Sequence, residues 1–169
     1  MSDGLLIDDP ATVDHPIDLA EEIASGNEWP FERASAGELV CEVSGQYCDY
    51  RLFFAWRADA AAVHLACLVD IRVDDRKRAN VHVLHGLINE KLWIGHFELC
   101  SEQGAPLWRH TLLNRGLNAH DAIGQLEEAV ETALNECERY YPAHQFLLWG
   151  GQSPDAAFEM ALFETAGEA

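Results

Sequence analysis

Apolar and polar positions recur with two different periods along the chain, and the two periods occupy separate blocks. Between Pro16 and Gly26 the apolar residues are three or four positions apart, as on one face of a helix. Pro16 suits the first turn, where its missing N–H would have no helical acceptor, and Gly26 suits the end of the helix. From about residue 38 the period becomes two, which predicts strands.

Alternating segments at 38–43, 47–57 and 63–72 are joined by short connections, which predicts a run of antiparallel hairpins. A short strand near 31–34 is expected to precede them. A second helix is expected from Asp74 or Asp75, either of which can cap it, followed by strands over 93–99 and 106–113. One sheet face is expected to lie under the helices: Tyr50, Leu52, Phe54, Trp56, Val63, Leu65, Val69, Phe97 and Leu99.

The pattern predicts helices in the last third of the chain. The longest helix is expected to begin at 118–121 and to kink or end at Pro142, with a further helical turn over 144–149. Ser153 and Pro154 then form a strong helix start. The resulting order is α-β(3-4)-α-β-β-α-α. Strands in blocks predict an α+β fold with an antiparallel sheet of five to six strands and helices on one face.

Composition narrows the class of protein. A chain of 169 residues with 49% hydrophobic residues is expected to form one domain, over 15–169, after a disordered acidic tail at 1–14. The net charge of −18 disfavours nucleic acid and anionic membrane surfaces as partners. The sequence shows neither a signal peptide nor an apolar run of 18 residues, so a cytoplasmic location is expected.

The charge is unevenly distributed. Residues 1–32 hold nine acids and no Lys or Arg, and residues 121–169 hold ten acids and one base, Arg139. Residues 33–120 hold ten of each sign and are neutral. We therefore expect an acidic exterior formed by the two ends of the chain, with a more neutral sheet available to partners.

The five cysteines form no CxxC pair. If Ser44 and Gly45 formed a two-residue turn, Cys41 and Cys48 would face each other across the hairpin. Two reduced thiols are the expectation for a cytosolic protein. A longer turn would abolish the pairing.

Candidate chemistry is sparse. His82 and His85 lie three apart on the predicted second helix, but a zinc site needs three or four ligands and the sequence contains no HExxH motif. Cys100 and His110 lie on strands expected to pair, which makes nucleophilic catalysis conceivable. Neither a GxSxG motif nor a phosphate-binding glycine loop is present. We therefore expect no catalytic residue, metal or cofactor, with a small His/Cys-dependent hydrolase or transferase as the alternative.

The second face of the sheet is less polar than a face meant only for water. Apolar residues surrounded by charges resemble a contact surface for another protein. Coverage by the chain's own loops or by a second copy would also fit this pattern. The candidate partner-binding residues are Phe53, Ala55, His64, Ala66, Leu68, Ile94 and His96.

Four segments together resemble the YbjN-domain family, in a form seen in Alphaproteobacteria. They are Glu-Trp-Pro-Phe-Glu at 28–32, Cys-Asp-Tyr-Arg-Leu-Phe-Phe at 48–54, Leu-Ile-Asn-Glu-Lys-Leu-Trp-Ile-Gly-His-Phe at 87–97, and Trp-Gly-Gly-Gln-Ser-Pro at 149–154. The resemblance covers the chain from about residue 16 to its end.

The resemblance implies a fold similar to type III secretion chaperones and a role as a sensory-transduction regulator. Such chaperones are small, acidic and usually dimeric, and they bind extended protein segments. The resemblance carries over no catalytic residues. The expected function is therefore a non-enzymatic cytosolic protein-binding module, chaperone-like or regulatory, with a protein partner and the possibility of a homodimer.

Overall fold

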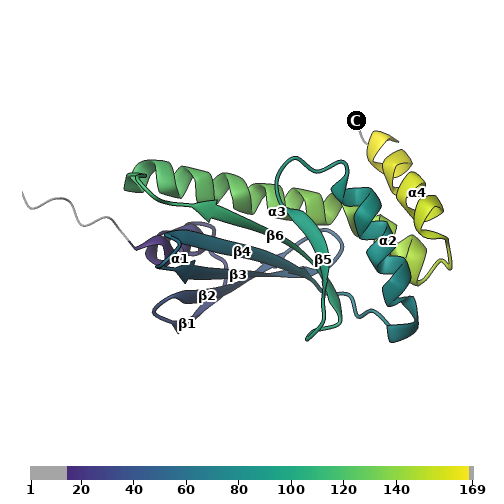
Figure 1. Cartoon of the computed structure of the whole chain (residues 1–169), viewed down its shortest axis with the longest axis horizontal. Coiled ribbons are helices and arrows are strands. Elements are labelled where there is room, and N and C mark those ends of the chain that lie inside the picture. The colour runs from purple at the N-terminus through teal and green to yellow at the C-terminus, as the bar shows by residue number, and fades with distance from the viewer. Residues whose placement is uncertain (1–14, 168–169) are drawn as a thin grey trace, which may run out of the picture.

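The computed structural model describes residues 15–167, so the expected tail at 1–14 lies outside the described part. Six strands form one antiparallel sheet in the order β1-β2-β3-β4-β6-β5 (Figure 1). The elements are α1 (Pro16–Gly26), β1 (Phe31–Ser35), β2 (Glu38–Ser44), β3 (Asp49–Arg57), β4 (Ala62–Val69), a 3-10 turn (Asp75–Lys77), α2 (Arg78–Asn89), β5 (His96–Cys100), β6 (Ala105–Leu113), α3 (Ala119–Leu148) and α4 (Pro154–Gly167).

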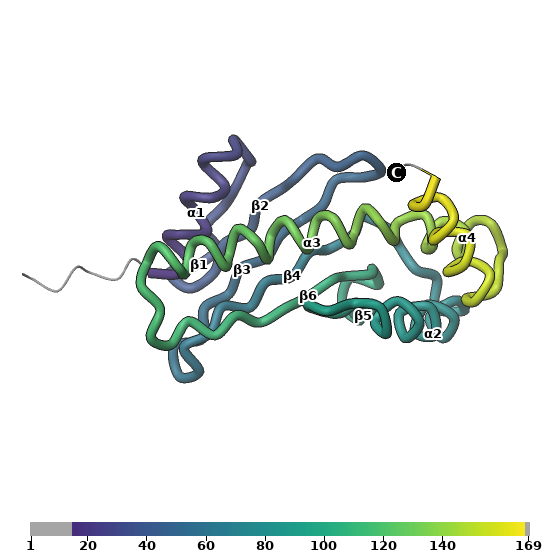
Figure 2. Tube along the Cα trace, turned by 90° about the horizontal axis from the view of Figure 1, so that it is seen from above, coloured from purple at the N-terminus to yellow at the C-terminus, as the bar shows by residue number. Residues whose placement is uncertain are grey.

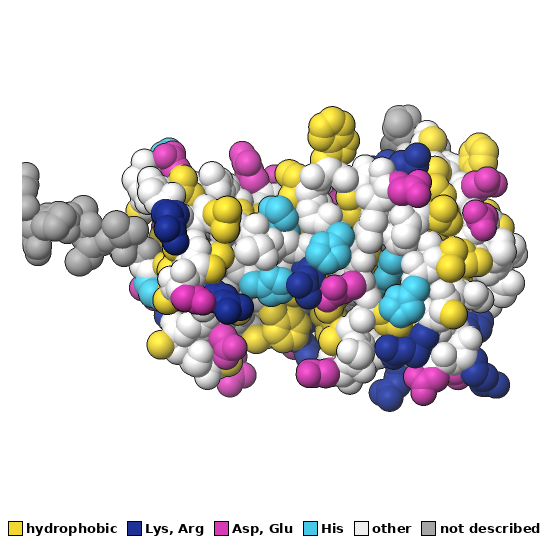
Figure 3. Space-filling view, in the orientation of Figure 1, with side chains coloured by type: hydrophobic (Ala, Val, Ile, Leu, Met, Phe, Trp, Pro, Cys, Tyr) yellow, Lys and Arg dark blue, Asp and Glu magenta, His cyan; other side chains and the backbone are white. Residues whose placement is uncertain are grey.

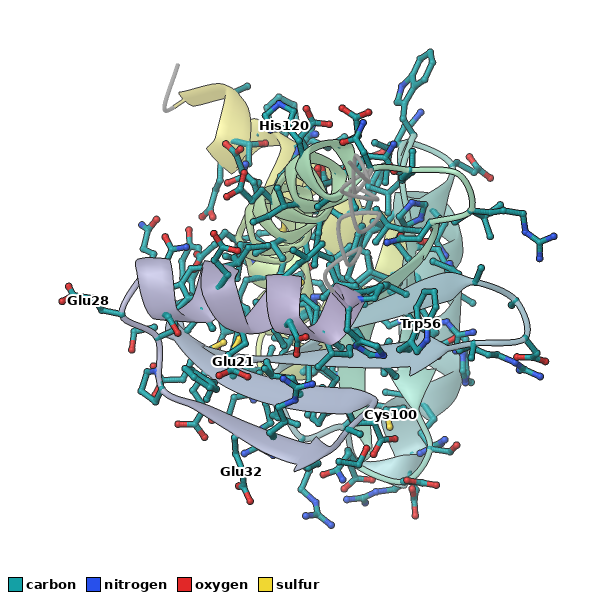
Figure 4. The ribbon with its side chains drawn as sticks, turned by 90° about the vertical axis from the view of Figure 1, so that its left-hand side faces the viewer. Glu21, Glu28, Glu32, Trp56, Cys100 and His120 are labelled. Atoms are coloured by element: carbon teal, nitrogen blue, oxygen red, sulfur yellow. The ribbon has the colours of Figure 1, made fainter. Side chains whose placement is uncertain are left out.

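The helices form a layer on one side of the sheet and at one end of it. Figure 2 shows α3 running along the length of the sheet, with α1 beside it at one end and α2 packed with α4 at the other. In the view along the molecule, Glu32 of β1 points away from the helices (Figure 4). The expected α+β class and element order are confirmed.

The sheet face predicted to lie under the helices forms the core. Leu52 and Leu65 are fully buried there, and only Trp56 of the predicted set remains half-buried. The largest fully buried side chain is Trp108 of β6, which lies on the same face opposite Cys67. Alternation along β6 places Trp108 there, because residues two apart on a strand share a face.

The first helix begins and ends where the sequence predicts. The His15 ring accepts a hydrogen bond at Nδ1 from the backbone N–H of Ile17, which caps the helix start. The Arg33 guanidinium reaches Asp18 at 2.6 Å and Glu21 at 2.9 Å, and these ion pairs link β1 to α1. The edge strand β1 is thus held from the helix side as well as by β2.

The long helix α3 continues through Pro142, where a kink or an end was predicted. A proline inside a helix removes one backbone hydrogen bond and costs about 3 kcal/mol. Here Tyr140, Tyr141, Ala143 and His144 are all buried on either side of the proline. Burial of this segment therefore outweighs the local cost, and 144–148 belongs to the same helix.

The turn between β2 and β3 is longer than the two residues considered above. Ser44 pairs with Asp49, so residues 45–48 form the loop, and Cys41 lies opposite Leu52 instead of Cys48. All five cysteines are free. The pairing of Cys41 with Cys48 is therefore wrong, because the four-residue loop shifts the register.

The segment between α2 and β5 also differs from its prediction. Trp93 was expected on the apolar face of a strand, but the strand begins only at His96 and Trp93 is 100% exposed. Gly95 has a φ of +68°, a left-handed conformation that turns the chain into β5. Because the chain turns at Gly95, the alternation of β5 does not extend back to Trp93.

Asn89, the last residue of α2, completes the hydrogen bonding of the β5 edge. Its amide Nδ2 donates to the carbonyl oxygen of Phe97 at 3.0 Å, and its Oδ1 accepts from the backbone N–H of Phe97 at 2.7 Å. The side chain thus bonds to Phe97 as a neighbouring strand would.

We expect Asn89→Ala to lower the free energy of unfolding by about 2 kcal/mol, because two backbone groups of Phe97 lose their partners. Urea unfolding followed by circular dichroism measures the change. Asn80→Ala, at an exposed position of the same helix, is the control and should change little. Equal effects of the two substitutions would contradict this role for Asn89.

Candidate partner-binding face

The sheet has a second face, which we call the open face, made of the side chains that point away from the core. The register places Val40, Phe53, Ala66, Arg109 and His96 in one row across five strands. The helices of residues 15–167 lie on the other side of the sheet or beyond its end (Figures 1 and 4). The open face is therefore uncovered by any described helix.

The middle of the open face is apolar. Val40, Phe53 and Ala66 lie side by side on β2, β3 and β4, and each is half-buried. Leu68 and Ala55 extend this centre along the strands and are also half-buried. These side chains retain exposed apolar surface in the folded chain, and its removal from water would stabilise a complex by about 25 cal/mol per Å².

Polar and charged groups border the centre at β5 and β6. Arg109 Nη1 lies 2.8 Å from Glu98 Oε1, and His96 Nε2 lies 3.5 Å from Glu98 Oε2. His64 Nδ1 and Thr111 Oγ1 are 3.2 Å apart, across β4 and β6. Figure 3 shows histidines gathered over these strands beside basic and acidic side chains.

Burial lowers the pKa of His64, and the positive charge of Arg109 lowers it further. Its imidazole is therefore neutral at pH 7. Beside it, Arg109 of β6 and Glu98 of β5 form an ion pair at the same border of the open face.

The opposite end of the open face is hollowed. A cavity of about 390 Å³ is lined by side chains of both signs and by apolar residues of β3 and β4. Within residues 15–167, Arg51 and Arg72 in its wall form no ion pair. The cavity residues are Glu42, Asp49, Tyr50, Arg51, Leu68, Val69, Asp70, Arg72, Gln103 and Ala105.

Six of the seven residues proposed from sequence lie together on the open face: Phe53, Ala55, His64, Ala66, Leu68 and His96. Ile94 does not. It lines a groove with His110, Leu112 and α3, on the helix side of the sheet. Val40 and Arg109 were not predicted from sequence. Each follows a buried strand residue, Leu39 or Trp108, so alternation alone could have placed both on the open face.

The structure separates the residues considered for catalysis. Cys100 lies opposite Ala105 on the open face, whereas His110 lies five residues further along β6 on the helix side. At about 3.3 Å per residue this is roughly 16 Å along the strand. Within the described residues, no group of three or more His, Cys, Asp and Glu side chains could hold a metal ion.

A hydrogen-bonded pair of histidines is buried in the core. His85 of α2 and His144 of α3 face each other with Nε2 atoms 2.9 Å apart. His144 Nδ1 lies 2.9 Å from the carbonyl oxygen of Tyr140, so it must carry a proton and donate. His144 Nε2 then accepts, and His85 Nε2 donates to it. Both rings are neutral in this arrangement, which joins α2 to α3.

Burial explains the neutral state of the pair. It lowers the pKa of His85 to about 2, with help from the neighbouring His144, and it lowers the pKa of His144 to about 4. His85 and His144 are 3% and 1% exposed, so neither can act on a solute. The pair is a structural element of the core.

The sequence of the chain matches the model of a known protein family. The model of the YbjN family, described as "Putative bacterial sensory transduction regulator", matches residues 16–146. The chain belongs to the YbjN family. The match spans α1, the whole sheet, α2 and most of α3, and ends before α4. The open face therefore lies entirely within the YbjN region.

A solved structure, "Crystal Structure of the ExsC-ExsE Complex", is similar to this YbjN protein, with a TM-score of 0.44 and 15% sequence identity. The similarity covers 78% of this chain and 91% of that one. No curated protein sequence matches the chain. Among the described residues, no helix has the length and apolar character needed to cross a bilayer.

Proposed function

We propose that this YbjN protein is a non-enzymatic, cytoplasmic regulator that acts by binding another protein on the open face of its sheet. The observation that carries the proposal is the uncovered apolar centre formed by Val40, Phe53 and Ala66. An apolar centre with a polar border is the usual plan of a protein–protein contact. The description of the family as a regulator of sensory transduction supports the same reading.

The sheet edge offers a second element for such a partner. All five residues of β1 are exposed, and β2 is its only neighbour in the sheet formed by the described residues. At the other edge, Asn89 already satisfies the backbone of Phe97. An extended partner segment could therefore add to the sheet at β1 and continue onto the open face.

Two other readings remain testable. A second copy of the chain could occupy the open face, although a net charge of −18 on each copy opposes self-association. Light scattering measures this directly. A His/Cys-dependent hydrolase or transferase requires those side chains to converge, and the separation of Cys100 from His110 weighs against it.

The test is affinity capture from the native cell with mass spectrometry, comparing the wild-type chain with Phe53→Asp. A carboxylate at position 53 cannot be buried in an apolar contact without cost, so capture of the partner should fall roughly tenfold, equal to about 1.4 kcal/mol. Val83→Asp is the matched control, because Val83 is an exposed apolar residue on α2. Equal capture by all three proteins would refute the open face as the binding site.

Phe53 is half-buried, so circular dichroism must first show that Phe53→Asp is folded. Ala66→Glu, in the same row of the open face, supplies a second variant with the same expected loss. Because the apolar centre dominates this contact, capture should depend only weakly on salt concentration. Loss of the partner on modest addition of salt would point to the acidic helices instead.

A further inference from the structure

A groove separate from the open face lies on the helix side of the sheet, between α3 and β6. Its volume is about 370 Å³, within the range of pockets that hold ligands. Leu112 and Ala129 lie at its base, 9% and 5% exposed, and Ile94 forms a wall that is 46% exposed. Figure 2 shows α3 passing alongside β6 here.

The border of the groove is acidic. Glu128 and Glu131 of α3 line it and are exposed, and no ion pair involves either of them within residues 15–167. Arg139, the only base of residues 121–169, is in contact with Glu136. Among the described residues, no lysine or arginine lines the groove and His110 is its one histidine, whose pKa burial lowers. The groove is therefore negative at pH 7.

Trp93 is 100% exposed and is next in sequence to Ile94, which lines the groove. Gly95, two residues further on, packs directly against the buried indole of Trp108. A fully exposed tryptophan contributes nothing to the core, and aromatic residues of this kind are enriched in protein contacts. Trp93 is therefore an exposed aromatic side chain next in sequence to a lining residue of the groove.

We infer that the groove binds a partner segment that carries an apolar anchor residue with lysine or arginine within one helical turn of it. The anchor would occupy the space between Ile94 and Ala129 and contact Trp93, and the bases would pair with Glu128 and Glu131. Charge complementarity favours such a partner over a second copy, because a second copy brings another net charge of −18.

Three fluorescein-labelled 15-residue peptides test the inference by fluorescence anisotropy with the full-length chain. The first carries leucines at helical spacing with lysines around them, the second replaces the leucines with serine, and the third replaces the lysines with glutamate. Only the first should bind. Binding of the serine peptide with equal affinity would overturn the inference, as would failure of the first peptide to bind.

Variants locate the binding. The pair Glu128→Lys/Glu131→Lys, and separately Ile94→Asp, should each weaken binding of the first peptide roughly tenfold or more, about 1.4 kcal/mol. Glu22→Lys/Glu102→Lys makes the same change in net charge at exposed positions elsewhere and should leave the affinity nearly unchanged. Equal weakening by both double variants would overturn the groove as the site.

Two further results distinguish binding in the groove from binding on the open face and from dimerisation through the groove. Phe53→Asp alters only the open face, so it should leave peptide binding unchanged even if the proposal for that face fails. If light scattering shows a wild-type dimer that Ile94→Asp dissociates, a second copy occupies the groove and the inference is overturned.

Discussion

Gly95→Ala is expected to destabilise the fold by several kcal/mol, through both a steric overlap and backbone strain. A β-carbon at this position would overlap the indole of Trp108, which is fully buried and cannot move aside without disturbing β6. The backbone also has a φ of +68°, which costs a non-glycine residue about 1–2 kcal/mol. Overpacking adds about 1–3 kcal/mol, so the total loss is about 2–5 kcal/mol.

Gly116→Ala is the matched control for this substitution. Gly116 also has a positive φ, +79°, but nothing lies within 4 Å of a β-carbon there. It should therefore cost only the backbone strain, about 1–2 kcal/mol. Urea unfolding of the two variants measures the difference. Equal losses in the free energy of unfolding would mean that the close approach of Gly95 to Trp108 does not contribute to stability.

Acid is expected to destabilise the protein through the buried His85 and His144 before most carboxylates titrate. In the unfolded chain both imidazoles have a pKa near 6.5, whereas burial lowers the folded values to about 2 and about 4. Below pH 6.5 the unfolded chain therefore binds protons that the folded chain does not. The free energy of unfolding must fall with pH, by roughly 3–4 kcal/mol for the pair between pH 7 and pH 5.

The double variant His85→Leu/His144→Leu isolates this effect, because leucine cannot titrate and both partners of the hydrogen bond are removed together. Its stability should vary less with pH than that of the wild-type chain over the same range. His120→Gln, at an exposed position of α3, is the control and should keep the wild-type pH dependence. Identical pH profiles of the double variant and the wild-type chain would show that the pair does not resist protonation.

Periodicity alone predicted most of the architecture. The alternation in β3 and β4 placed Leu52 and Leu65 in the core and Phe53 and Ala66 on the other face, and the structure agrees. This succeeds because a strand has a fixed period of two, so each buried residue determines the side of its neighbours. Six residues of the open face could thus be named from sequence, whereas Val40, Glu98, Arg109 and Thr111 were missed.

The failures arise where tertiary packing or loop geometry overrides the local pattern. The helix continues past Pro142 because its neighbours are buried on both sides, which no local rule reports. The loop at 45–48 is held by a hydrogen bond from the backbone N–H of Gln46 to Glu138, 92 residues away. Ile94 was placed with the open face because the left-handed turn at Gly95 was not recognised.

The groove beside α3 could not be predicted from sequence for the same reason. It brings Ile94 together with Ala129 of a different helix, and only the packing of α3 across β6 creates that contact. The sequence did show the acidic composition of residues 121–169. It could not show that two of those acids border a groove with an apolar base.

Site-specific photo-crosslinking in the native cell tests the central claim, binding of a partner protein on the open face, most directly. A photoreactive residue at Ala55 lies on that face, and one at Val83 lies on exposed α2 as the control. A defined protein adduct should form from position 55 and disappear when Phe53→Asp is added, with no such adduct from position 83. An adduct only from position 83, or one from position 55 that persists with Phe53→Asp, would contradict the claim.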